Sequence, residues 1–82
     1  MAGVEVNKTY TGKIVSIAPF GLFIEIMGKQ GLCHISEIAY EKIYNLKDLY
    51  KEGDEIEVKV IGINEKGQIK LSRKALLKPP SK

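Results

Sequence analysis

The sequence predicts a small all-β barrel of five short strands. β-Branched and aromatic residues gather in short segments, which favours a pleated and half-buried surface. Several segments alternate apolar and polar residues, as a strand with one buried face does. Glycine, proline and asparagine separate the segments at turns. A chain of 82 residues has room for one such domain with a small core.

The first two strands are predicted from composition and from alternation. Thr9 to Ile17 is rich in β-branched residues, and Pro19 ends this strand because proline cannot donate a ladder hydrogen bond. In Leu22 to Ile26, the leucine and the two isoleucines share one face, which we expect to point into the core. Phe23 and Glu25 share the other face and are expected to point outward.

The remaining strands follow from turn residues. Met27 to Gly31 is predicted to be a turn and Leu32 to Ile35 a short third strand. Glu55 to Ile63 alternates regularly, and Asn64 to Gly67 is a hairpin loop with glycine late in the turn. Gln68 to Ser72 completes the set, with its isoleucine and leucine inward.

One long connection separates the third strand from the fourth. Within it, Ser36 to Ile38 and Asn45 to Lys51 are each predicted to form a short helical turn before Gly53. Five strands with a short helical connection at this place match the five-stranded Greek-key OB-fold barrel, which binds oligonucleotides on its second and third strands. The same pattern also permits an SH3-like barrel.

The predicted domain extends from residue 7 to residue 77, with flexible ends at residues 1–6 and 78–82. The second end contains Pro79 and Pro80, which remove backbone donors. No apolar run is long enough to span a membrane, and the N-terminus lacks the pattern of a signal peptide.

A single cysteine, Cys33, indicates a reducing compartment, and we expect the cytoplasm. It leaves no partner for a disulfide framework and no CxxC metal site. We therefore expect no bound metal and no cofactor.

The basic residues are unevenly distributed. Residues 1–65 carry seven basic and ten acidic side chains, whereas residues 66–82 carry six basic side chains and no acidic one. This positive C-terminal part can attract a polyanion, or it can be a solvated tail.

Phe20 and Phe23 are the strongest candidates for a binding site. An outward aromatic ring beside Gly21 exposes apolar surface, and stacking on a base is a function that explains such exposure. The alternative is that one or both rings fill the small core. His34, on the third strand, is a candidate to stack on a base or to hydrogen-bond a phosphate or a 2′-hydroxyl, although a lone histidine is more often structural.

Lys66, Lys70 and Arg73 are candidate phosphate contacts, which add affinity without sequence information. Solvation of the barrel rim is the alternative for each of them. Neither Ser16 nor Ser36 has the histidine and acid of a hydrolytic triad, and the glycines do not form a phosphate loop. The domain by itself is therefore predicted not to be an enzyme.

Several motifs together resemble the S1 RNA-binding domain. They are Phe20-Gly21-Leu22-Phe23-Ile24, Gly31-Leu32-Cys33-His34-Ile35-Ser36-Glu37, Gly53-Asp54-Glu55-Ile56 and Ile69-Lys70-Leu71-Ser72. The resemblance covers nearly the whole chain and implies an OB-fold whose RNA-binding face holds Phe20, Phe23 and His34. Where the family often has an aspartate and an arginine, this chain has Asn64 and Gln68. These two amides can still hydrogen-bond to RNA, and Lys66 or Lys70 can supply the missing cation.

Within this family, the opening Val6-Asn7-Lys8-Thr9-Tyr10-Thr11-Gly12-Lys13 and the closing Leu71-Ser72-Arg73-Lys74-Ala75-Leu76-Leu77 are most similar to the C-terminal S1 domain of bacterial polynucleotide phosphorylases. Those are trimeric, cytoplasmic 3′-to-5′ exoribonucleases that use phosphate, with their chemistry in other domains. The resemblance implies a module that captures single-stranded RNA with low sequence preference. Alternatives are an S1 module of a ribosomal, transcription or translation protein, a protein-docking domain that uses the same aromatic patch, and a fragment that binds only within the trimer.

Overall fold

The computed structural model describes residues 3–78, which form five strands and three short 3₁₀ helices. The strands are β1 (Thr9–Ala18), β2 (Gly21–Ile26), β3 (Lys29–His34), β4 (Glu55–Ile63) and β5 (Ile69–Ser72). The 3₁₀ helices are η1 (Ile35–Glu37), η2 (Leu46–Asp48) and η3 (Lys74–Leu76). None of the helices in this part of the chain is long and apolar enough to cross a membrane.

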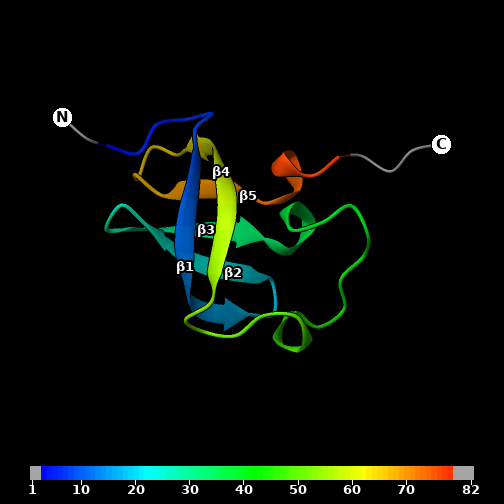
Figure 1. The fold of residues 1–82 in the computed structure, drawn as a ribbon. Coiled ribbons are helices and arrows are strands. Elements are labelled where there is room, and N and C mark those ends of the chain that lie inside the picture. Colours follow the sequence, from blue (N-terminus) through cyan, green and yellow to red (C-terminus); the bar gives the residue numbers. More distant parts are fainter. Residues whose placement is uncertain (1–2, 79–82) are drawn as a thin grey trace.

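The strands close into a barrel in the order β1-β2-β3-β5-β4. All neighbours are antiparallel except β3 and β5, which run parallel. β1 and β4 cross β2 and β3 at a steep angle, so the barrel has two layers (Figure 1). The predicted all-β OB-fold barrel is confirmed.

The alternation predicted for the second strand is also confirmed. Leu22, Ile24 and Ile26 are 0–1% exposed and lie in the centre of the core. Val58, Val60, Ile69 and Leu71 pack against them from β4 and β5. Burial of each such side chain contributes about 1.5–3 kcal/mol to folding.

The turn between β2 and β3 is shorter than predicted. Only Met27 and Gly28 form it, and both have a positive φ, 51° and 78°. Two positive φ angles make a type I′ loop, whose twist matches that of the flanking strands. The prediction of a five-residue turn was therefore wrong, because Lys29 and Gln30 already pair with Ile26 and Glu25.

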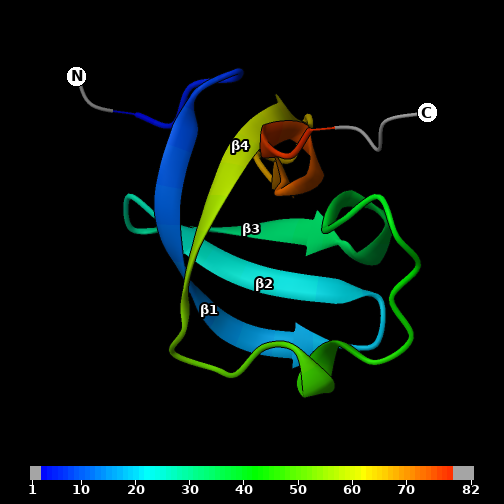
Figure 2. The same ribbon diagram turned by 45° about the vertical axis from the view of Figure 1, so that its right-hand side comes forward.

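The long connection carries the two predicted helical turns, as η1 and η2, and is attached to the barrel by buried groups. Ile38 and Leu46 are 0% and 3% exposed and join the core. The Ser72 hydroxyl donates to Glu37 Oε1 at 2.8 Å. η1 and η3 lie near each other on one side of the barrel, and the connection runs down that side from η1 to η2 (Figure 2).

The segment before β1 is also in contact with the barrel. Val4 packs against the core, and the Asn7 N–H donates to the Val60 carbonyl at 2.7 Å. Of the flexible ends predicted at residues 1–6 and 78–82, residues 1–2 and 79–82 lie outside the described residues.

Candidate nucleic-acid interface

A single outward row crosses four strands of the barrel. Ser16 of β1 pairs with Phe23 of β2, Phe23 pairs with Leu32 of β3, and Leu32 pairs with Lys70 of β5. Directly paired residues point to the same side of a sheet. The register therefore places an aromatic ring, an aliphatic side chain and a cation side by side on the outer face.

Phe20 and Phe23 form an aromatic pair on this face. Their ring centroids lie 5.9 Å apart with an interplanar angle of 89°, an edge-to-face arrangement that aromatic rings favour. Phe20 is 48% exposed and Phe23 is half-buried, and neither belongs to the core cluster. The pair therefore supports itself and still presents apolar ring surface to solvent.

Gly21 brings this pair next to His34. Gly21 and His34 are direct partners across β2 and β3. A Cβ atom on residue 21 would lie 2.5 Å from the Cys33 carbonyl oxygen, so only glycine permits this approach. The Ile35 N–H also donates to the Phe20 carbonyl at 2.8 Å. We define Phe20, Phe23 and His34 as the aromatic platform.

Ser36 holds the His34 ring through its Nδ1 atom. Its Nδ1 accepts from the Ser36 N–H at 3.1 Å and lies 2.8 Å from the Ser36 hydroxyl oxygen. A backbone N–H can only donate, so the neutral ring carries its proton on Nε2. His34 therefore caps η1 through Nδ1 and keeps Nε2–H as an exposed donor. It can thus have a structural role and a binding role at the same time.

A groove of about 190 Å³ lies beside the platform. The side chains of Phe23, Asn64, Gln68 and Lys70 line it, together with Gln30, Gly31, Leu32 and Ile69. The fold thus brings together four of the residues singled out in the sequence, from β2, from the β4–β5 loop and from β5. Its lining combines apolar residues with polar ones.

The two amides at the rim have a defined orientation. Asn64 Oδ1 accepts from the backbone N–H groups of Lys66 and Gln68, both at 2.9 Å, so Asn64 Nδ2 must be the donor to Gln68 Oε1 at 2.7 Å. The Gln68 Nε2 group then keeps its N–H donors for a ligand. A neutral, hydrogen-bonded pair therefore stands where the family often has an acid and a cation.

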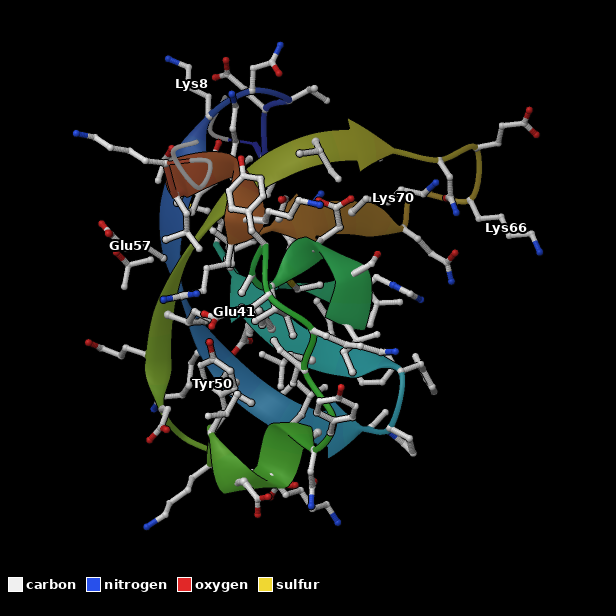
Figure 3. The ribbon with its side chains drawn as sticks, turned by 90° about the vertical axis from the view of Figure 1, so that its right-hand side faces the viewer. Lys8, Glu41, Tyr50, Glu57, Lys66 and Lys70 are labelled. Carbon is white, nitrogen blue, oxygen red and sulfur yellow. The ribbon has the colours of Figure 1, made fainter. Side chains whose placement is uncertain are left out.

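Lys66 and Arg73 do not line the groove. Lys66 lies at the tip of the β4–β5 hairpin, farther from the barrel than Lys70 (Figure 3). Arg73 is half-buried, and its Nη1 donates to the Ile38 carbonyl at 3.0 Å. A larger hollow of about 540 Å³ at the end of the barrel includes Arg73 but no other predicted site residue. Arg73 thus attaches the long connection to the barrel through Ile38 and is not part of the groove. Its position in the sequence, three residues after Lys70, did not indicate this.

Gln30 and Leu32 were missed in the sequence. Both have the same parity as His34 on β3 and therefore point to the outer face. Correct assignment of the two-residue turn at Met27 and Gly28 would have identified Gln30, whereas Leu32 already lay in the predicted strand, two residues before His34.

Comparisons with known proteins identify the family of the chain. The S1 RNA binding domain family matches residues 4–74. The polyribonucleotide nucleotidyltransferase of Chlamydia trachomatis is 57% identical over 75 residues, which cover 90% of this chain and 11% of that protein. The chain therefore spans about a tenth of the length of the curated relatives that it matches.

Two solved structures extend the comparison. A chain in the a/eIF2alpha-aDim2p-rRNA complex of Pyrococcus horikoshii OT3 is 31% identical with a TM-score of 0.85, over 94% of this chain and 48% of that one. GSP13 of Bacillus subtilis is 36% identical with a TM-score of 0.81, over 98% of this chain and 63% of that one. The chain has the barrel and the aromatic platform described above, and the S1 family matches residues 4–74. The chain therefore belongs to the S1 RNA-binding domain family.

Proposed function

We propose that this domain captures single-stranded RNA with low sequence preference, as the non-catalytic RNA-binding part of a polyribonucleotide nucleotidyltransferase. The similarity to that enzyme over nearly the whole chain supports the parent. We also propose that this longer protein carries the RNA-cleaving chemistry in its other domains, assembles as a trimer and lies in the cytoplasm.

The exposed edge-to-face pair Phe20 and Phe23 beside the groove carries this proposal. Stacking on aromatic rings tolerates every base, since each base has a π-face. His34 Nε2, Gln68 Nε2 and the Lys70 ammonium surround the rings with donors. Such donors suit the phosphate oxygens and the 2′-hydroxyl oxygens that all RNA sequences contain.

Alanine substitution of the platform tests the proposal. We expect Phe20→Ala and Phe23→Ala each to weaken binding of an oligouridylate by about 1–3 kcal/mol, the value of one stacked base. Fluorescence anisotropy titration measures the affinity, and thermal unfolding confirms that each variant is folded.

Leu49→Ala is the matched control. Leu49 is 60% exposed but lies on the long connection and outside the groove. Its substitution should leave the affinity unchanged. Unchanged affinity in a folded Phe20→Ala/Phe23→Ala double variant would contradict RNA stacking and would favour protein docking on the same patch.

A further inference from the structure

A lysine and a tyrosine lie beyond the His34 end of the outer face. The Lys74 ammonium is 5.2 Å from the centroid of the Tyr40 ring and 3.5 Å from the Ser36 carbonyl oxygen. Tyr40 is 42% exposed and Lys74 is half-buried. A cation over a ring face is attracted to it, so the two side chains hold each other in place.

Contacts connect this pair to the aromatic platform without a gap. The His34 ring contacts the Ser36 hydroxyl at 2.8 Å, and the Ser36 carbonyl accepts from Lys74. Parallel pairing of β3 with β5 explains this proximity. Leu32 pairs with Lys70, and Ser36 and Lys74 each follow four residues later along segments that leave the barrel together.

The Lys74 ammonium offers a polyanion a positive contact at this end of the face, beside a hollow that Tyr40 and Glu41 line together. Both contacts of the Lys74 ammonium are uncharged groups, so neither neutralises it. At the opposite end of the face, Glu25 pairs with Lys13 of β1 and Gln30 of β3. That end therefore places the Glu25 carboxylate on the outer face, beside Lys13 in the strand register.

We propose that Tyr40 and Lys74 form a second nucleotide subsite, which binds the RNA strand as it leaves the aromatic platform past His34. The Tyr40 ring stacks on a base with the face that Lys74 leaves free. The Lys74 ammonium pairs with the adjoining phosphate. This subsite rests on the proposed function and extends it, since a longer strand gains a contact that a short one cannot reach.

Tyr44 provides a matched control on the same connection. The Lys42 ammonium lies 5.6 Å from the Tyr44 centroid, and the Tyr44 side chain is 85% exposed. Tyr44 lines a small hollow with Ile17, Ala18 and Pro19, and Ser36 is not part of that lining. It has the same chemistry as Tyr40 without the link to His34.

The test compares oligouridylates of about four and about ten nucleotides, because OB-folds bind about 4–16 nucleotides. Tyr40→Ala should lower affinity for the longer oligomer about 5- to 50-fold, within the range of one lost stack. Its affinity for the shorter oligomer should change less than about twofold, since the platform is intact. Lys74→Gln should show the same dependence on length and should also reduce the response of affinity to salt.

The outcomes separate the subsite from the proposed function. If Phe20→Ala weakens binding of both oligomers while Tyr40→Ala and Lys74→Gln bind the longer one as the unaltered domain does, the subsite is wrong and the platform stands. Equal losses in Tyr40→Ala and Tyr44→Ala would also overturn the subsite, because any exposed tyrosine would then suffice. If Phe20→Ala has no effect, the proposed function fails and the subsite fails with it.

Discussion

At the residue scale, Cys33 and His34 show how one short strand serves both the core and the surface. Cys33 is 0% exposed, and its thiol donates to the Glu37 carbonyl at 3.6 Å. His34, the next residue, points outward and presents Nε2 to solvent. Because side chains alternate along a strand, these two neighbouring residues face opposite ways.

Burial raises the pKa of the Cys33 thiol from 9.0 to about 11. The nearby Glu37 carboxylate adds to this rise, while a hydrogen bond from the Arg73 backbone opposes it. The folded protein therefore keeps the thiol proton over a pH range in which the unfolded chain loses it. The stability that this proton contributes is complete below pH 9 and is lost as the pH rises to about 11.

We expect the free energy of unfolding to fall by about 2–3 kcal/mol over this range on account of Cys33. Urea unfolding at about pH 8 and about pH 10.5 measures the fall. Cys33→Ser is the control, because its hydroxyl does not titrate in this range and should make the fall smaller. The half-buried Tyr50 also has a raised pKa, so a shallow decline remains in both proteins. An equal decline in Cys33→Ser would show that Cys33 is not its cause.

At the scale of elements, the β2–β3 hairpin decides which residues reach the binding face. The type I′ turn at Met27 and Gly28 sets the register that pairs Phe23 with Leu32 and Gly21 with His34. Sequence analysis placed a longer turn here because Met-Gly lacks the asparagine typical of this turn type. The strands themselves were predicted, but the start of β3 depended on two backbone angles.

Met27 has a positive φ, which is unfavourable for a side chain other than that of glycine, asparagine or aspartate. We expect Met27→Asn to stabilise the domain by about 0.5–1 kcal/mol, because asparagine adopts the left-handed conformation at a lower free-energy cost than methionine. Chemical unfolding measures the difference. Met27 is 55% exposed, so Met27→Leu keeps the strained angle with little change in packing and should be neutral. Equal stabilisation by both substitutions would show that backbone strain is not the cause.

At the scale of the whole molecule, charged side chains lie on both sides of the barrel. Lys66 and Lys70 lie on the side of the groove, whereas Lys8 and Glu57 lie on the opposite side (Figure 3). The basic C-terminal part predicted from the sequence thus divides in the fold. Lys66 and Lys70 flank the groove, Lys74 lies near Tyr40, and Arg73 contacts the long connection.

RNA affinity should therefore fall as salt rises, with a logarithmic slope of about −0.7 for each phosphate contact to a single strand. Lys66→Gln/Lys70→Gln should reduce the magnitude of this slope by about 1.4, equal to two contacts. Lys8, on the far side of the barrel, offers the control, and Lys8→Gln should keep the slope (Figure 3). A slope that does not change in the double variant would remove both lysines from the phosphate path.

The sequence by itself determined the five strands, the inward set of Leu22, Ile24 and Ile26, and the platform residues. These features depend on alternation and on short motifs, which are local. The tertiary structure alone decided that parallel pairing of β3 and β5 brings Lys70 beside Leu32 to form the groove. It also decided the direction of the Asn64–Gln68 hydrogen bond and the attachment of Arg73 to Ile38. The Leu32–Lys70 pair and the Arg73–Ile38 contact join distant segments, the latter 35 residues apart, so their geometry depends on barrel closure and not on any local pattern. The Asn64–Gln68 bond joins residues four apart, but its direction depends on the backbone N–H groups that the folded loop turns toward Asn64 Oδ1.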